Sequence, residues 1–227
     1  EMFGFLRSTG GCIFLNMRDE RVVAEAHGIE CCYSYGSEKA DYEVLAVENK
    51  SNGMVLQIAK GNTRHKEGFP VQIIGDHNVE NVLAAVVVGT EMGVSTTGIR
   101  EGIGNYQPKM NRTELIEGEG WTILLDAYNA NPSSMAAAVR TVGQQAEGPA
   151  ALILGDMFEM GPNSLDMHRE LVRYVKEHLQ DALLIGIGKA MTEAIHLEAP
   201  AQRHYLDVAD AAPNIAADLE GREFILI

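Results

Sequence analysis

The sequence predicts an α/β fold in two parts, with a largely parallel sheet in the second part. From about residue 114 onward, short apolar runs alternate with segments of helical periodicity, which is typical of βαβ units in a parallel sheet. The earlier part differs, because it contains the signal of a β-hairpin. A polar stretch with one proline, residues 105–115, separates the two patterns. We therefore place two domains at 1–110 and 111–227.

The first expected elements are a strand at 11–16 and a helix at 19–28. "GCIFLN" is a short apolar run, and "DERVVAEAHG" has apolar residues at helical spacing and stops on a glycine. Two β-rich runs fill residues 42–59 around "NKSNG". Asn52 and Gly53 supply the positive φ angles of a tight turn, so this region is predicted to be a hairpin.

A strand at 69–75 and two helices are expected next. The segment "DHNVENVLAAVVVGTEMG", residues 76–93, has an apolar body, with Asp76 as the expected N-cap and a glycine near its end. A shorter helix at 95–106 starts at a Ser/Thr cap. The first part of the chain is therefore expected to end in a pair of helices.

In the second part, strands and helices alternate along the chain. Strands are expected where apolar runs are short, and helices where apolar residues recur at helical spacing. Pro213 is expected to interrupt the last helix, because proline removes a backbone donor. The expected strands are 121–126, 150–156, 182–188, 204–207 and 222–227, and the expected helices are 131–146, 164–178, 189–199 and 208–220.

Composition excludes some classes of function. The net charge of −14 provides no basic surface for a nucleic-acid backbone, so no nucleic-acid partner is expected. No apolar run reaches the roughly 18 residues of a membrane span, and no signal peptide is recognised. The chain starts at Glu1 and its last apolar run stops at the chain end, which suggests a fragment of a longer protein. Cys12, Cys31 and Cys32 are expected to be buried thiols in a reducing cytosol.

The segment "LLDAYNANPSSM" places polar side chains where an expected strand meets a helix. In an open parallel sheet, ligands bind outside the carboxyl ends of the strands. Asp126 could accept hydrogen bonds from the two hydroxyls of a ribose there, and Tyr128 could stack on a base. Asn129 or Asn131 could bind the edge of that base. The alternative is that Asp126 and Asn131 cap the helix while Tyr128 packs, and the residues alone favour neither reading.

A second polar cluster opens the helix expected at 76–93. His77, Asn78 and Asn81 lie in its first turn, at the end that carries the positive partial charge of the helix dipole. They could bind a ligand or form a solvated first turn. Arg112 could clamp a phosphate through two hydrogen bonds, although an arginine in a linker is usually only solvated.

The segment "GIGKAMT" (186–192) has only part of a phosphate-loop pattern. The full pattern is G-x-x-x-x-G-K-[ST]. Here the first glycine is absent, and Ala190 occupies the place of the magnesium-binding hydroxyl. We interpret this segment as an ordinary strand-to-helix turn.

Four segments together resemble the Mur ligase family: "GDHNVENVLAA", "YQPKMNRTEL", "LLDAYNANPSSMAAAV" and "LILGDMFEMGPNSLDMH". They are most similar to the members that join D-alanyl-D-alanine to UDP-N-acetylmuramoyl-tripeptide. The resemblance covers nearly the whole chain. It implies the end of a central ATPase domain at 1–110, followed by a truncated, Rossmann-like, largely parallel C-terminal domain at 111–227.

The resemblance also implies a reaction, in the cytoplasm and in a monomeric enzyme. ATP, with Mg²⁺, phosphorylates the carboxylate of UDP-N-acetylmuramoyl-tripeptide, and the amine of D-alanyl-D-alanine then attacks the acyl phosphate. This is a step of peptidoglycan precursor synthesis, and the resemblance implies no catalytic base or nucleophile for it. The phosphate loop and most magnesium ligands of the family would lie before Glu1.

The residues that the resemblance assigns here are nucleotide binders: His77, Asn78, Asn81, Arg112, Asp126, Tyr128, Asn129 and Asn131. Candidates for contacts to D-alanyl-D-alanine are Asp156, Glu159 and His168, each of which could equally be a cap or a surface residue. Two other interpretations stay open. One is a related ligase of the folylpolyglutamate synthase type, which the "YNANP" corner disfavours, and the other is a nucleotide-binding module without turnover.

Overall fold

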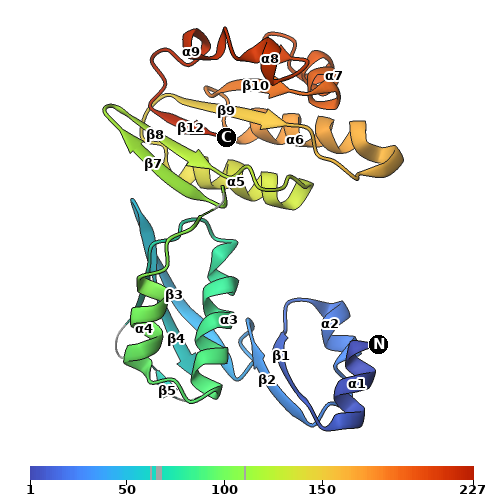
Figure 1. Cartoon of the computed structure of the whole chain (residues 1–227), viewed down its shortest axis with the longest axis vertical. Helices are drawn as coiled ribbons and strands as arrows, with labels where there is room; N and C mark the ends of the chain where they lie inside the picture. The colour runs from blue at the N-terminus through green and yellow to red at the C-terminus, as the bar shows by residue number, and fades with distance from the viewer. Residues whose placement is uncertain (62, 65–67, 110) are drawn as a thin grey trace. The chain divides into compact units, whose positions relative to one another are not determined.

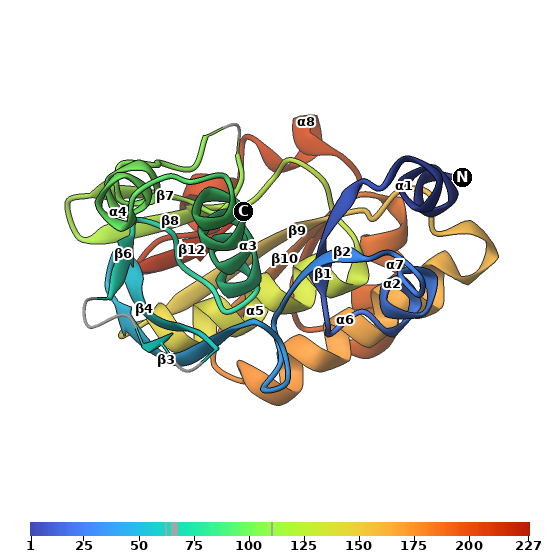
Figure 2. The ribbon, with the colours of Figure 1, turned by 90° about the horizontal axis from the view of Figure 1, so that it is seen from below.

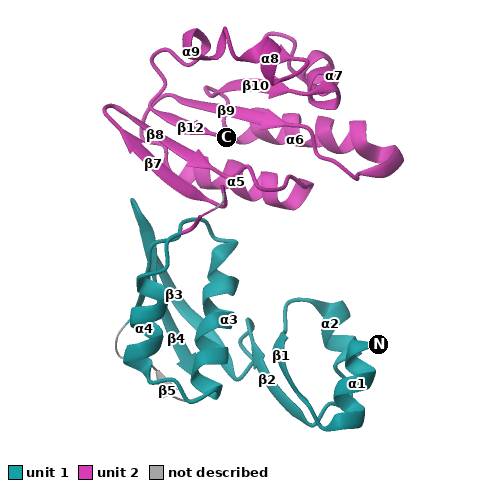
Figure 3. Ribbon diagram, in the orientation of Figure 1, with its two compact units in different colours: residues 1–107 teal, residues 108–227 magenta. Residues whose placement is uncertain are grey.

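The structure is a computed structural model that describes residues 1–61, 63–64, 68–109 and 111–227, with the backbone alone for 63–64. The chain divides into two compact units, Glu1–Gln107 and Pro108–Ile227 (Figure 3). Both units combine helices with a sheet, as the α/β class predicted from the sequence requires. Within the described residues, no helix is long and apolar enough to cross a membrane.

The first unit is built on a mixed sheet in the order β1-β2-β3-β4-β5, with β6 paired to β4. Strands β1, β2 and β3 are parallel, and β4 runs antiparallel to its neighbours β3, β5 and β6. The strands are β1 (Cys12–Asn16), β2 (Cys31–Tyr35), β3 (Tyr42–Lys50), β4 (Gly53–Lys60), β5 (Thr63–Arg64) and β6 (Phe69–Val71). The helices are α1 (Met2–Thr9), α2 (Glu20–Glu25), α3 (Asn78–Glu91) and α4 (Thr96–Gly104).

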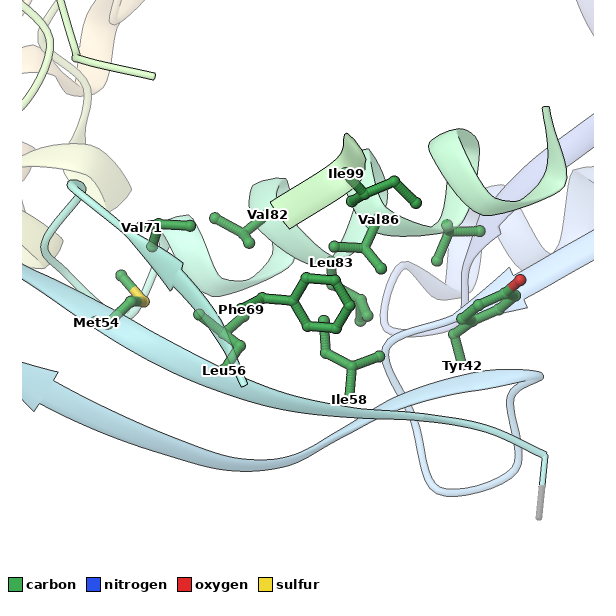
Figure 4. Close-up of a cluster of buried hydrophobic side chains, with 11 residues drawn as sticks. Tyr42, Met54, Leu56, Ile58, Phe69, Val71, Val82, Leu83, Val86 and Ile99 are labelled. Atoms are coloured by element: carbon green, nitrogen blue, oxygen red, sulfur yellow. The ribbon is translucent and has the colours of Figure 1, made fainter. Parts of the chain in front are cut away.

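Helix α3 packs on the sheet and forms one side of the hydrophobic core of the first unit. Its residues Val82, Leu83 and Val86 follow helical spacing and point at Leu56 and Phe69 of the sheet (Figure 4). Burying an apolar side chain of this size stabilises the fold by about 1.5–3 kcal/mol. Helices α1 and α2 lie beside β1 over a smaller cluster (Figure 1). The apolar body of α3 is therefore fixed against the sheet.

Most expected elements of the first unit are present, including the hairpin of β3 and β4. The strand expected at 69–75 ends at Val71, and His77 rather than Asp76 occupies the N-cap of α3. Helix α1 and strand β2 were not expected from the sequence.

One expectation about the cysteines is wrong. Cys12 and Cys31 form a disulfide, because they lie directly opposite each other on the neighbouring strands β1 and β2, with Cα atoms 4.5 Å apart. Cys32 is a free, half-buried cysteine, and burial raises the pKa of its thiol.

The second unit has a sheet in the order β11-β10-β9-β12-β8-β7. All neighbouring strands are parallel except β7, which pairs antiparallel with β8. The strands are β7 (Glu114–Gly118), β8 (Trp121–Leu125), β9 (Ala150–Gly155), β10 (Leu183–Ile187), β11 (Arg203–Tyr205) and β12 (Phe224–Leu226). The helices are α5 (Pro132–Gln145), the short 3₁₀ helix η1 (Gly161–Asn163), α6 (Ser164–His178), α7 (Lys189–Glu198), α8 (Val208–Ala211) and α9 (Ile215–Asp218).

The predicted parallel sheet is confirmed, and helices cover both of its faces. Helices α5 and α6 lie on one side and α8 and α9 on the other (Figure 1). Figure 2 shows α5 and α6 side by side across the strands. The helix expected at 208–220 is broken into α8 and α9 around Pro213, as predicted. Strand β7 was not expected; its first two residues lie in the polar stretch 105–115 that the sequence suggested as the boundary.

Candidate functional site

The carboxyl edge of the second sheet contains a pocket of about 340 Å³. It lies where β12, the last strand in the chain, inserts between β8 and β9. Open α/β sheets bind ligands at such reversals of strand order. Its lining includes the buried side chains of Met135 and Leu154 and the exposed rings of Tyr128 and Phe158. A pocket with an apolar lining and a few polar groups is the usual form of a small-molecule site.

Asp126 lies at this edge, directly after β8, as the sequence predicted. Its backbone N–H donates to Ile227 O at 2.7 Å, which fixes the start of the corner to the end of β12. Its carboxylate Oδ1 accepts from the N–H of Thr113 at 3.1 Å. A carboxylate has about four acceptor positions. Asp126 can therefore hold the chain before β7 and still accept a hydroxyl from a ligand in the pocket.

Arg112 and Tyr128 form a contact that the sequence did not reveal. The guanidinium carbon lies 3.7 Å from the centroid of the Tyr128 ring, as a cation–π pair. The residues on both sides of Arg112 have left-handed backbone, with φ of 59° at Asn111 and 50° at Thr113. This turn, together with the bond from Thr113 to Asp126, directs Arg112 toward the pocket rim. A stacked guanidinium keeps its N–H edge available for an anion.

The two asparagines of the corner have different environments. Asn131 is the N-cap of α5, and its Oδ1 accepts from the N–H of Ser134 at 2.9 Å and from Ser133 Oγ at 2.7 Å. Ser134 Oγ in turn accepts from the N–H of Asn131, which completes a capping box. Asn129 is exposed and lines the pocket. Capping therefore accounts for Asn131, and Asn129 is the better placed of the two for a ligand.

Asp156 also lines the pocket, but its carboxylate caps a helix. It accepts from the N–H of Met191 at 2.8 Å and of Ala190 at 3.3 Å, in the first turn of α7. Residues 186–192 partly match a phosphate loop. Two of their backbone N–H groups therefore donate to a side chain of the protein itself. Glu159 is exposed and has a left-handed backbone, with φ of 62°.

His168 is fully buried in α6, so it does not reach the pocket surface. Its Nε2 accepts from the N–H of Met157 at 2.9 Å, and a backbone N–H can only donate. Nε2 therefore has no proton, and Nδ1 donates to Ser164 O at 2.7 Å. With both nitrogens engaged, His168 fixes the loop that contains Asp156 and Phe158. We accordingly assign it a structural role instead of a substrate contact.

The polar residues of the first unit gather at the amino end of α3, as the sequence predicted. Asn78 is half-buried; its Nδ2 donates to Ile74 O at 2.9 Å and lies 3.1 Å from His77 Nε2. Its Oδ1 accepts from Asn81 Nδ2 at 3.1 Å. Asn78 is thus a support, whereas Asn81 and His77 are exposed. Among the described residues there is no group of three His, Cys, Asp or Glu side chains that could hold a metal ion.

Comparison with known proteins extends these findings. Residues 1–89 match the model of the Mur ligase middle domain, and residues 111–227 match that of the Mur ligase glutamate ligase domain. Over its whole length the chain is 28% identical to the UDP-N-acetylmuramoyl-tripeptide–D-alanyl-D-alanine ligase of Bacillus subtilis, of which it covers 50%. The chain therefore spans about half the length of this curated relative.

Solved structures share the fold. A crystal structure of MurF from Acinetobacter baumannii is 24% identical, with a TM-score of 0.82 over 96% of this chain and 48% of that one. MurF ligase from Thermotoga maritima, solved in complex with ADP, is 15% identical, with a TM-score of 0.75 over 95% of this chain and 49% of that one. Since one family model alone covers more than half of the residues, and a second matches most of the remainder, the chain belongs to the Mur ligase family.

Proposed function

We propose that the protein containing this chain is the ATP-dependent ligase that adds D-alanyl-D-alanine to UDP-N-acetylmuramoyl-tripeptide. Members of the family are ATP-dependent ligases. The observation that carries the proposal is the pocket at the carboxyl edge, bordered by Asp126, Asn129 and the Arg112–Tyr128 pair. Two supports come from relatives: the name of the Bacillus subtilis protein, and the ADP bound by the Thermotoga maritima protein.

In this proposal the described residues bind and orient the nucleotide. Asp126 accepts hydrogen bonds from ribose hydroxyls, and Arg112 donates to a phosphate. Tyr128 offers a base the ring face that the guanidinium does not cover. On the first unit, Asn81 and His77 are the exposed candidates for nucleotide contacts, and Asn78 supports Asn81.

The chemistry proceeds in two displacements. The carboxylate of the tripeptide attacks the γ-phosphorus of ATP, an acyl phosphate forms, and ADP leaves. The amine of D-alanyl-D-alanine then attacks the acyl carbon, the C–N bond forms, and inorganic phosphate leaves. Mg²⁺ would neutralise charge on the transferred phosphoryl group, but no described cluster has three suitable ligands, so we assign no step to it. Water must be kept away from the acyl phosphate, which hydrolyses readily.

The location and the acceptor site are also proposals. We propose that the enzyme is monomeric and cytoplasmic. In that compartment the Cys12–Cys31 disulfide would be exposed to reduction by cellular thiols. Asp156 and Glu159 remain the candidates for D-alanyl-D-alanine, and Asp156 is the one that lines the pocket. Because its carboxylate already caps α7, it would contact the substrate only through the acceptor positions that remain.

Steady-state kinetics of the complete ligase test the nucleotide assignments. Replacing Arg112 by Ala removes a charge-assisted contact worth roughly 1.5–3 kcal/mol, which slows turnover by about tenfold to a hundredfold. Asp126→Ala should mainly raise the KM for ATP, because ribose is held alike in ground and transition states. An Arg112→Ala enzyme with unchanged turnover and unchanged ATP affinity would remove Arg112 from the site.

A second test separates binding from turnover. The 227-residue sequence contains no complete phosphate-loop pattern, and enzymes with such a loop rely on it, on its lysine and on Mg²⁺ for phosphoryl transfer. We expect this chain alone to bind ADP without hydrolysing ATP or forming the peptide bond. Calorimetric titration with ADP and a phosphate-release assay measure the two properties separately, and peptide formation by the chain would contradict this expectation.

A further inference from the structure

Glu80 lies in the first turn of α3, between the residues that the proposed function uses. Its two carboxylate oxygens have different partners outside the helix. Asn16 Nδ2 donates to Oε2 at 2.8 Å, and Arg18 Nη1 donates to Oε1 at 3.0 Å. Asn16 is the last residue of β1, and Arg18 follows shortly after it. One carboxylate thus joins the start of α3 to the carboxyl end of a neighbouring strand.

The partners of Glu80 are themselves fixed. Arg18 Nε donates to Gly36 O at 2.6 Å, just after the end of β2, and the backbone N–H of Arg18 donates to Asn16 Oδ1 at 3.0 Å. Gly36 has φ of 95°, and a Cβ there would lie 2.9 Å from Asn16 Oδ1. The left-handed backbone at this position favours glycine, and a larger residue would also press on Asn16 Oδ1. The ends of two parallel strands therefore hold both partners of Glu80 through further hydrogen bonds.

The opposite side of the same turn is held independently. Asn78 bonds to Ile74 O, and Asn81 bonds to Asn78. Rotation or translation of the first turn would move Asn81, and the contacts of Asn78 provide one restraint on that turn. Glu80 precedes Asn81 in the sequence and is directed toward the strands. The two sets of contacts both restrain the turn that leads into the exposed Asn81.

Stability is a poor explanation for this network. The Arg18 side chain is 63% exposed, and ion pairs at such sites contribute little to the free energy of unfolding. We propose that Glu80, acting through Asn16 and Arg18, is a positioning residue that orients the first turn of α3 so that Asn81 can bind the nucleotide. This inference rests on the proposed function, since it requires that Asn81 contacts the nucleotide.

The test compares three carboxylate variants of the 227-residue chain. ADP affinity is measured by calorimetry, and the side-chain amide signals of Asn78 and Asn81 are recorded by NMR with and without ADP. Glu80→Ala should lower ADP affinity by about threefold to tenfold and shift or broaden the Asn81 signal even without ADP. Glu80→Gln keeps an acceptor for Asn16 and should remain within about twofold of the unmodified chain. Glu101→Gln removes an exposed carboxylate of α4 and controls for net charge.

Asn16→Asp provides a matched second variant, since it keeps the shape of the side chain and replaces the donor by a charge that repels Glu80. It should reproduce the Glu80→Ala result, and the double variant Asn16→Ala/Glu80→Ala should lose no more affinity than Glu80→Ala alone. Unchanged Asn81 signals and unchanged ADP affinity in Glu80→Ala would overturn the inference. If Asn81→Ala binds ADP normally while Glu80→Ala shifts the Asn81 signal, the nucleotide assignment of α3 fails, whereas the geometric role of Glu80 stands.

Discussion

Replacing His168 should weaken the second unit and loosen the rim of its pocket. The imidazole is fully buried, and its Nε2 accepts a hydrogen bond from the backbone N–H of Met157. Met157 is itself only 2% exposed. Without that acceptor, a buried backbone donor is unsatisfied, which costs about 1–3 kcal/mol. Loss of the hydrogen bond from Nδ1 to Ser164 O should cost less free energy, because a carbonyl in the first turn of α6 also accepts a backbone hydrogen bond within the helix. The loss should therefore come mainly from one hydrogen bond.

Two substitutions of similar size isolate that bond. His168→Leu fills the space but accepts no hydrogen bond, whereas His168→Gln can place its Oε1 near the former Nε2. We expect His168→Leu to be about 1–3 kcal/mol less stable than His168→Gln, a difference of about 4–12 °C in melting temperature for a domain of this size. His168→Ala should cost more, about 3–5 kcal/mol, because it also leaves a cavity.

Urea unfolding monitored on the second unit, together with hydrogen exchange of the Met157 amide, measures the effect. Glu177 lies on the same helix and is exposed, so Glu177→Gln serves as the control and should change the free energy of unfolding by less than about 0.5 kcal/mol. If His168→Leu and His168→Gln have equal stability and equal Met157 protection, the hydrogen bond does not hold the loop. The structural role that we assign to His168 would then be wrong.

Three further predictions concern stability. Asn131→Ala removes the side-chain half of the capping box of α5 and should destabilise the second unit by about 1 kcal/mol in urea unfolding. Cys31→Ser opens the disulfide to Cys12, 19 positions away, and should cost about 3 kcal/mol, as should reduction by dithiothreitol. Hydrogen bonds, chiefly from Arg173, lower the pKa of Glu198 from 4.5 to about 2. The stability that this pair contributes is complete above the ordinary pKa and is lost as the pH falls toward 2, so the difference between the unmodified chain and Glu198→Gln should shrink below about pH 5.

The carboxyl edge of the second sheet was predictable because its signals are local. An apolar run followed by Asp126, and a helix that begins with Asn131 and Pro132, fix a strand, a corner and a helix within a short segment. The alternation of strands and helices then implies a parallel sheet. Strand β7 escaped prediction because it is short and begins inside the polar stretch 105–115, and it becomes a strand by pairing with β8.

Contacts between distant residues could not be predicted. The disulfide depends on the register of β1 against β2, and β2 has too weak a strand signal to set that register from sequence. Arg112 contacts Tyr128 in a turn where Asn111 and Thr113 both adopt left-handed backbone, which asparagine favours but a β-branched threonine does not suggest.

The candidate site itself could be only partly resolved, because the residue types that cap helices are the ones that bind ligands. Asp, Asn and His supply acceptors and donors for either purpose. Burial and hydrogen-bond partners decide between the two roles. Asn131 and Asp156 are committed to helix amides and His168 to a loop amide. Asn81 and Asn129, of the same residue type as Asn131, are exposed at the amino end of α3 and at the pocket. A polar residue in a nucleotide-binding motif is therefore a candidate ligand contact only after its capacity for internal hydrogen bonds has been counted.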